Sequence, residues 1–432
     1  MKILMMTNTY KPFIGGVPRS VETFTEEYRK LGHQVKIVAP NFEGQEEDPN
    51  VTRVPALQHF NGTDFSVEIP IPFFLSDLME EFKPDIIHSH HPFLLGNTAL
   101  RLASHCEAPL IYTFHTFYER YTHYIPGEDS EAKHRFVNTL VTGYANLCDQ
   151  IFAPSLSVAK VLQERGVTRP IEVVPTGINV KAISQGNGTD FRISHRIPAE
   201  AFIVGFVSRL ALEKNLEFLC NAVLPLLELE TSVWFVIAGS GPLEEVLRKR
   251  FETHSCSQRC SDRILMLGDL KGSELYDFYR AMDVFAFASH SETQGLVVTE
   301  AMAGETPVVA LDAPGIREVV QDGINGRLLQ SENESEFTQA LHEFFQLPLS
   351  SRKAMGIEAK HMAETLSDEV CAKHALEIYS RAKRISVAAR KLESGWEEWL
   401  RQVSLEWELL VNLGRATGEA VLGRALVDKA EK

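Results

Sequence analysis

The sequence predicts an α/β protein built from two doubly wound domains, each with a mostly parallel sheet covered by helices on both faces. A chain of 432 residues is too long for one ordinary hydrophobic core. Apolar runs of strand length alternate with helical or loop segments along both halves of the chain, which is the pattern of a parallel sheet. A segment rich in Gly, Asn and Ser, from about residue 176 to 194, separates the two halves and is predicted to be a linker.

The amino-terminal domain is predicted to span residues 1–180. Its expected strands are residues 2–7, 35–39, 85–88, 110–114, 150–153 and 171–174. After the first strand, apolar residues recur at spacings of three and four, which predicts the buried face of a helix that Gly32 ends. They are Val17, Val21, Phe24, Tyr28 and Leu31.

The second domain is predicted to span residues 195–366, and residues 367–390 are predicted to form a further helical segment. The expected strands of this domain are residues 202–207, 233–238, 264–267, 284–288 and 308–311. A helical tail occupies residues 391–432, with an apolar stripe that includes Trp396, Trp399 and Trp407 opposite a mostly acidic face. A membrane-surface helix is normally basic, so we expect the tail to pack on the body or to support self-association.

Composition limits the possible partners. The chain is 44% hydrophobic and 23% charged, which is typical of a soluble globular protein, and its net charge of −15 argues against nucleic acid as a partner. No apolar run reaches the length of a membrane span, and the amino terminus does not read as a signal peptide, so we expect a cytoplasmic protein. His254, Cys256 and Cys260 match no zinc spacing, and we do not predict a metal site there.

The stretch SHSETQGLVVTEAMAGETP, residues 289–307, follows the apolar strand 284–288 and places two carboxylates on either side of a predicted helix start at Gly295. Free N–H groups and the helix dipole favour an anion at such a start. Glu292 lies in the loop and Glu300 lies more than one turn into the helix, an arrangement that suits a nucleotide sugar held through its diphosphate. Two solvated acids beside a helix are the alternative.

Further residues follow other predicted strands. Gly15 and Gly16 follow the first strand and precede a helix, so their backbone can approach a phosphate or a sugar, although a plain tight turn is the alternative. Arg209 and Lys214 follow strand 202–207 and suit a leaving diphosphate, although they could also be two surface cations.

Histidines end two strands of the first domain. His88, His90 and His91 end one strand and His115 ends the next. No Asp or Glu stands beside the first three, so we expect a polar wall of a ligand site rather than a metal site.

The stretches SETQG, HSHHPFLLG and TFHTFYERYTHYIP together resemble the retaining glycosyltransferases of family GT4, which have the GT-B fold. Gln294 points to the branch that glycosylates lipids, the diacylglycerol glucosyltransferases. The resemblance covers about the first 385 residues and implies that the last helix, within residues 367–390, crosses back to the first domain.

The resemblance also implies roles for individual residues. His115 and Glu292 are the implied catalytic residues, with His115 holding the sugar and Glu292 contacting its hydroxyls. The implied donor-binding residues are Gly15, Gly16, Arg209, Lys214, Gln294, Gly295, Leu296 and Glu300, with Glu300 on the ribose. Tyr118, Tyr121 and Tyr124 are expected to line an acceptor path, and their alternative is a place in the core and rim.

The function that these expectations describe is the retaining transfer of a hexose from a nucleotide diphosphate sugar, expected to be UDP-linked, to a hydroxyl of a glycerolipid. No convincing Asp-x-Asp motif is present, so no cofactor is expected and no motif supports stimulation by Mg²⁺. The protein would act as a cytoplasmic enzyme at the periphery of the inner membrane face. A nucleotide-sugar epimerase and a non-catalytic sugar- or lipid-binding protein are the alternatives, and the sequence does not distinguish the donor base, the sugar or the acceptor.

Overall fold

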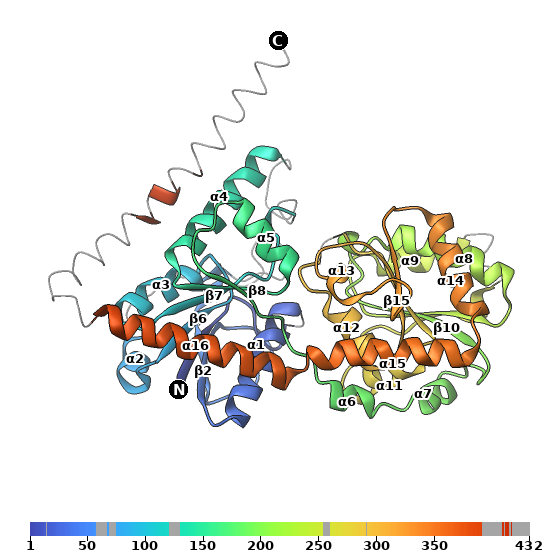
Figure 1. The fold of residues 1–432 in the computed structure, drawn as a ribbon, viewed down its shortest axis with the longest axis horizontal. Helices are drawn as coiled ribbons and strands as arrows, with labels where there is room; N and C mark the ends of the chain where they lie inside the picture. Colours follow the sequence, from blue (N-terminus) through green and yellow to red (C-terminus); the bar gives the residue numbers. More distant parts are fainter. Residues whose placement is uncertain are drawn as a thin grey trace, which may run out of the picture. The chain divides into compact units, whose positions relative to one another are not determined.

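The computed structural model divides the chain into two compact units (Figure 1). It describes residues 1–13, 15–57, 67–68, 75–120, 130–253, 260–290, 292–390, 408–409, 411–413 and 416. Unit 1 combines Met1–Thr176 with Cys371–Lys432, and unit 2 comprises Gly177–Val370. The chain therefore passes from one unit to the other twice.

Unit 1 is built on a seven-stranded sheet in the order β3-β2-β1-β6-β7-β8-β9, with every described pair of neighbours parallel. The strands are β1 (Lys2–Met6), β2 (Gln34–Pro40), β3 (Val51–Val54), β6 (Ile86–Ser89), β7 (Leu110–Thr113), β8 (Gln150–Ala153) and β9 (Ile171–Val173). The edge strand β3 has no counterpart in the sequence prediction because three of its four residues are only partly buried and its apolar signal is weak.

Helices of unit 1 connect these strands. They are α1 (Gly16–Lys30), α2 (Ser76–Phe82), α3 (Leu95–His105), α4 (Glu131–Leu147) and α5 (Leu156–Glu164), and a short hairpin pairs β4 (Ala56–Leu57) with β5 (Val67–Glu68). Val21 and Tyr28 of the predicted apolar face of α1 are 0% exposed, whereas Val17 is partly buried and Leu31, just after the helix, is 38% exposed. Val and Tyr lose χ1 freedom in a helix, so packing against the sheet rather than intrinsic propensity stabilises α1.

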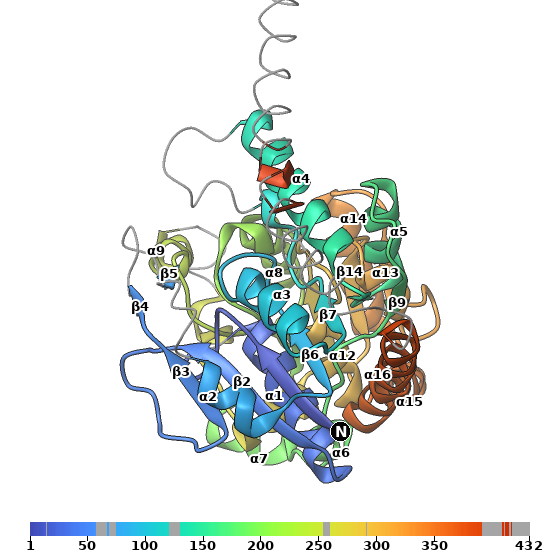
Figure 2. The ribbon, with the colours of Figure 1, turned by 90° about the vertical axis from the view of Figure 1, so that its left-hand side faces the viewer.

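The last long helix, α16 (Asp368–Arg390), runs along unit 1 after its first three residues (Figures 1 and 2). Lys383 pairs with Asp85 at 2.5 Å, Arg381 pairs with Glu172 of β9, and the buried Tyr379 lies against His88. These contacts attach α16 to the same sheet whose strands carry the predicted histidines.

Unit 2 contains a six-stranded sheet in the order β12-β11-β10-β13-β14-β15, and its described pairs are also parallel. The strands are β10 (Phe202–Val207), β11 (Val233–Ala238), β12 (Ile264–Met266), β13 (Val284–Phe287), β14 (Val308–Leu311) and β15 (Gly326–Leu329). The helices are α6 (Val180–Ser184), α7 (Gly188–Ser194), α8 (Leu216–Leu229), α9 (Glu244–Thr253), α11 (Ser273–Ala281), α12 (Leu296–Ala303), α13 (Ile316–Val319), α14 (Glu334–Gln346) and α15 (Leu349–Thr365), with the short 3₁₀ turns η3 (Leu212–Lys214) and η4 (Ser261–Arg263).

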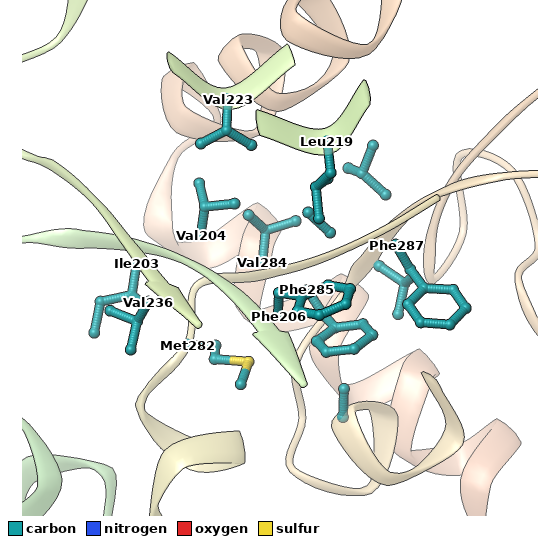
Figure 3. Close-up of a cluster of buried hydrophobic side chains, with 14 of the residues drawn as sticks. Ile203, Val204, Phe206, Leu219, Val223, Val236, Met282, Val284, Phe285 and Phe287 are labelled. Atoms are coloured by element: carbon teal, nitrogen blue, oxygen red, sulfur yellow. The ribbon is translucent and has the colours of Figure 1, made fainter. Parts of the chain in front are cut away.

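The core of unit 2 forms around the central strands β10 and β13 (Figure 3). Val204 and Val284, which face each other in register, are 0% exposed, and Leu219 and Val223 of α8 pack over them. Burial of a side chain of this kind contributes roughly 1.5–3 kcal/mol. A strand buried on both faces reads as a continuous apolar run, which is why the sequence predicted these strands well.

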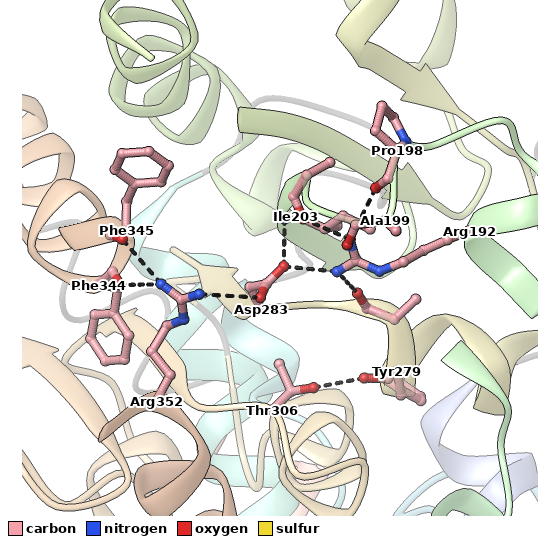
Figure 4. A network of polar contacts seen from close by, with 12 residues as sticks. Arg192, Pro198, Ala199, Ile203, Tyr279, Asp283, Thr306, Phe344, Phe345 and Arg352 are labelled. Carbon is pink, nitrogen blue, oxygen red and sulfur yellow. Dashed lines mark hydrogen bonds and ion pairs between the residues drawn. The ribbon is translucent and has the colours of Figure 1, made fainter. Parts of the chain in front are cut away.

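The segment predicted to be a linker is folded into unit 2 as α6 and α7. Asn179 and Asn187 cap the two helices, because Asn favours helix starts as well as loops. Arg192 of α7 donates to the carbonyls of Ala201 and Ala281, each at 2.6 Å, and pairs with Asp283 at 2.8 Å (Figure 4). The composition that suggests a linker therefore belongs to a packed part of the domain.

The carboxy-terminal tail contacts α4 in its described part. Leu409 packs on the core of unit 1, and a Cβ atom added to Gly143 of α4 would lie 2.7 Å from the side chain of Asn412. The stripe formed by Trp396, Trp399 and Trp407 lies outside the described residues. Self-association through the tail therefore remains a prediction.

Candidate functional site

In both units the candidate residues follow the strands where the order of the sheet reverses. In unit 1 this switch lies between β1 and β6, and in unit 2 it lies between β10 and β13. Open parallel sheets bind ligands beyond the carboxyl ends of their strands at such a switch point. The predicted residues are therefore placed where the fold permits a ligand.

A row of histidines lines the switch point of unit 1. His88 and His90 are both 0% exposed, and their rings lie 4.2 Å apart. Nδ1 of His90 lies 2.9 Å from Nε2 of His115, which is partly exposed at the end of β7. The structure thus connects His115 to the preceding strand through a hydrogen bond between two rings.

Hydrogen bonds to neighbouring segments also hold His88 and His91. His88 lies between the hydroxyl of Tyr379, 2.5 Å from Nδ1, and the hydroxyl of Thr113, 2.7 Å from Nε2. His91 Nδ1 accepts from the backbone N–H of Asn8 at 3.1 Å. The histidine row is therefore hydrogen-bonded to β7, to α16 and to the loop after β1, and its rings are held in defined orientations.

Burial keeps these histidines neutral. It lowers the pKa of His88 and His90 well below the ordinary value, with the neighbouring histidines as a second cause, and it lowers the pKa of His91 and His115 to about 3. In the part of the chain that the structure describes, no three His, Cys, Asp or Glu side chains are grouped so that they could hold a metal ion. The row offers hydrogen-bond donors and acceptors.

The predicted glycine loop lies at the end of β1. Helix α1 begins at Gly16, and Gly15 precedes it in an extended conformation. A Cβ atom on Gly15 would lie 3.1 Å from the ring of Phe13, whereas a Cβ atom on Gly16 would meet no atom within 4 Å. A side chain at Gly16 would therefore extend into open space.

In unit 2 the predicted residues of two neighbouring loops meet. Lys214 Nζ lies 2.6 Å from Glu292 Oε1, and the two side chains are only 16% and 12% exposed. The carbonyl of Glu213 accepts from the N–H of His290 and from Ser289 Oγ, both at 3.1 Å, which joins the β10 and β13 loops. Arg209 is exposed, and no residue of the described chain forms an ion pair or hydrogen bond with its guanidinium.

Helix α12 begins beside this pair, as the sequence predicts. Gly295 precedes it with φ of +76°, a left-handed conformation in which L side chains are strained, and a Cβ atom there would lie 2.3 Å from Ile316 Cδ1. Gln294 is 7% exposed and Leu296 forms the first helical position. The N–H groups of the first turn are the natural partners of an anion at this point.

Glu300 lies within α12 as predicted. The sequence analysis missed two residues, one in contact with Glu300 and the other in contact with Gln294. Tyr279 of α11 donates its hydroxyl to Glu300 Oε2 at 2.8 Å, and both side chains are buried. Gly315, with φ of +79°, lies so close to Gln294 that a Cβ atom would be 2.7 Å from the Gln294 backbone. Neither contact has a local sequence signal, because its two partners belong to different segments of the chain and meet only in the fold.

Of the aromatic residues predicted to line an acceptor path, Tyr118 is described and Tyr121 and Tyr124 are not. The ring of Tyr118 packs edge-on against Phe93 with ring centroids 5.4 Å apart. Its hydroxyl is buried and has no hydrogen-bond partner within the described chain. His254 and Cys256 also lie outside the described residues.

Comparisons with known proteins identify the family of the chain. Residues 14–182 match the family described as Glycosyltransferase Family 4, and residues 188–362 match Glycosyl transferases group 1. The alpha-monoglucosyldiacylglycerol synthase of Streptococcus pneumoniae is 30% identical over 77% of this chain and 76% of its own length. The synthase of the same name from Acholeplasma laidlawii is 28% identical, with 79% and 88% covered, and a GDP-mannose-dependent alpha-mannosyltransferase of Corynebacterium glutamicum is 28% identical, with 80% of each chain covered.

Solved structures share the fold. Sucrose-phosphate synthase from Thermosynechococcus elongatus superposes with a TM-score of 0.71 at 18% identity, covering 88% of this chain and 99% of the other. HepE of Anabaena in complex with UDP gives 0.67 at 18% identity, covering 88% and 100%. Among the described residues, no helix combines the length and the apolar character needed to cross a membrane.

Proposed function

The chain belongs to glycosyltransferase family 4 and has the GT-B fold, and we propose that it is a retaining enzyme that moves a hexose from UDP to a hydroxyl of a glycerolipid. The observation that carries this proposal is the Lys214–Glu292 pair beside the start of α12. It combines a cation for a leaving diphosphate with a carboxylate for sugar hydroxyls. The names of the two glucosyldiacylglycerol synthases support a lipid acceptor.

The donor is held by unit 2 in this proposal. The diphosphate lies against Lys214, Arg209 and the N–H groups that begin α12, where charge-assisted hydrogen bonds are strongest. Glu300 accepts from the ribose hydroxyls and Glu292 accepts from the sugar. The backbone of Gly16, where a side chain would meet no neighbour, is a further proposed donor contact, together with that of Gly15.

The reaction breaks the bond between the anomeric carbon and the phosphate oxygen and forms a bond from that carbon to the acceptor oxygen on the same face. The leaving diphosphate oxygen accepts the proton of the acceptor hydroxyl, so no separate base is required. Charge that develops on the diphosphate is stabilised by Lys214 and Arg209, and preorganised electrostatic stabilisation of this kind is commonly the largest contribution to the rate. His115 holds the sugar during the transfer.

Tyr118 is proposed to line the acceptor path, together with Tyr121 and Tyr124. The buried hydroxyl of Tyr118, which has no hydrogen-bond partner within the described chain, supports a polar contact along an otherwise aromatic surface. The enzyme would meet its acceptor at the membrane surface as a peripheral protein.

The test is a donor screen with the full-length protein and diacylglycerol in phospholipid vesicles. UDP-glucose, UDP-galactose and GDP-mannose are supplied in turn, and the lipid product is analysed by mass spectrometry and by NMR of its anomeric proton. We expect an α-linked hexosyl lipid from a UDP-sugar. A β-linked product, or no lipid product from any of these donors, would overturn the proposal.

Two outcomes of the same screen identify the alternatives. Free sugar or an epimerised donor formed without any acceptor would indicate an epimerase, which shares this fold. Donor binding without turnover would indicate a non-catalytic protein. Lys353→Ala, which changes an exposed lysine of α15, serves as the control for the site variants described below.

A further inference from the structure

The histidine row of unit 1 contains one contact that fixes where its protons lie. Nε2 of His90 faces Met5 Sδ at 3.4 Å, and both residues are 0% exposed. A thioether sulfur can accept a hydrogen bond but has no proton to donate. The favourable arrangement therefore places a proton on Nε2 of His90, because two lone pairs would otherwise face each other in a buried place.

The remaining nitrogen of His90 then determines the state of its neighbour. A neutral imidazole carries one proton, so Nδ1 of His90 is an acceptor when Nε2 is protonated. Burial lowers the pKa of both His90 and His115, so both rings are neutral at pH 7. The 2.9 Å contact between His90 Nδ1 and His115 Nε2 then requires that His115 donates from Nε2.

We propose that Met5 and His90 are positioning residues that hold His115 as the neutral tautomer protonated on Nε2, so that Nδ1 of His115 is an acceptor nitrogen. Any group that contacts this nitrogen must then donate a proton, as a sugar hydroxyl does and a carboxylate does not. The consequence for the substrate rests on the proposed role of His115 in sugar binding. The tautomer itself does not depend on that role.

The adjacent His88 provides a natural control. Its two nitrogens face hydroxyl groups, those of Tyr379 and Thr113, and hydroxyls can donate or accept. The rings of His88 and His90 lie 4.2 Å apart at a tilt of 32°, and within the described residues no hydrogen bond joins the two side chains. Removal of the Tyr379 hydroxyl should therefore change His88 and leave the tautomer of His115 unchanged.

The experiment is two-bond ¹H–¹⁵N NMR of the full-length protein labelled with ¹⁵N in its 15 histidines. The His115 and His90 signals are assigned from their absence in His115→Gln and His90→Phe. In the unmodified protein we expect His115 to show a protonated Nε2 and an unprotonated Nδ1, with the other tautomer roughly tenfold less populated, the ratio that one buried hydrogen bond supports. A protonated Nδ1 on His115 would overturn the proposal.

A variant tests the cause. Met5→Leu removes the sulfur acceptor while nearly preserving side-chain volume, a change that cores usually tolerate. The Nε2–H of His90 then loses its acceptor, so the preference for that tautomer weakens and the Nδ1-protonated form of His115 should rise by roughly tenfold, the contribution of one buried hydrogen bond. Tyr379→Phe should leave the His115 pattern as it is. An unchanged His115 pattern in Met5→Leu would show that Met5 does not control it.

These spectra are read without substrate, so they remain informative if no transfer activity is found. Should the donor screen fail while His115 shows the expected tautomer, the proposed function would be wrong and the tautomer assignment would stand. Should the screen succeed while His115 is protonated on Nδ1, the proposed function would stand and the tautomer assignment would be wrong.

Discussion

The two units place different chemistry at the same position of the same kind of sheet. In unit 1 the switch point is lined by histidines that burial keeps neutral, and in unit 2 it is lined by a lysine–glutamate pair that retains 16% and 12% exposure. A buried neutral group can be satisfied by single hydrogen bonds, whereas charged groups need a partner of opposite charge and some water. At this position unit 1 therefore offers neutral hydrogen-bonding groups, and unit 2 offers charged ones.

The largest effect should come from removal of the cation in unit 2. For Lys214→Ala we expect kcat/KM for transfer to fall by roughly 10²–10³, because a charge that stabilises the leaving group is lost. Lys214→Arg should recover part of the activity because it keeps the charge. Steady-state kinetics with a UDP-sugar donor measure both, and Lys353→Ala should match the unmodified protein. Activity of Lys214→Ala within threefold of normal would remove Lys214 from the proposed anion site.

The neutral histidine row should make the stability of unit 1 sensitive to acid. His88, His90, His91 and His115 have a lowered pKa in the folded state, so below pH 6.5 the unfolded chain binds protons that the folded chain does not. Stability that is fully present above pH 6.5 is therefore lost as the pH falls, by roughly 1.4 kcal/mol per pH unit for each histidine.

Hydrogen exchange at pH 6.5 and 5.5 measures this loss as the free energy of opening of β6. Strand β10 of unit 2 has no histidine in its own sequence and is the internal comparison. His91→Asn keeps an acceptor near the position of Nδ1 and should reduce the slope in β6 by about one histidine's share. Equal slopes in β6 and β10 would contradict the difference between the two units.

A smaller effect is expected from the buried hydrogen bond beside α12. Tyr279→Phe removes the donor to Glu300, and we expect the KM for the donor to rise by roughly three- to tenfold with little change in kcat, because one hydrogen bond is lost. Tyr276→Phe on the same helix is the matched control. The same rise in both variants would show that the effect comes from α11 as a whole and not from the contact with Glu300.

The smallest effect should come from the ion pair between α16 and unit 1. Burial alone would raise the pKa of Asp85, but hydrogen bonds from Lys383 and from the backbone of Lys2 outweigh it and lower that pKa. The side chains of the pair are 41% and 28% exposed, so water screens it in part, and Lys383→Met should change the free energy of unfolding by less than about 1 kcal/mol. Urea unfolding measures the change, and a difference that persists in 1 M salt would show that the contact is not mainly electrostatic.

The sequence by itself determined the central strands of both sheets and the residues that follow them. Continuous apolar runs such as residues 202–207 can be buried on both faces only in a covered parallel sheet, and polar residues directly after such runs must lie at its carboxyl edge. The positions of His115, Lys214 and Gly295 relative to their own strands follow from this, as does the fold class, which the structure confirms.

Only the tertiary structure decided how these residues meet. The pairing of Lys214 with Glu292, the contact of Tyr279 with Glu300, and the hydrogen bond of Tyr379 with His88 join segments between 21 and 291 residues apart, and no local pattern encodes them. The helices α6 and α7 likewise replace a predicted linker. Asn and Gly favour both helix caps and loops, and long-range contacts such as the ion pair of Arg192 in α7 with Asp283 favour the folded helices. Local composition sets which groups are available, and long-range packing sets which of them touch.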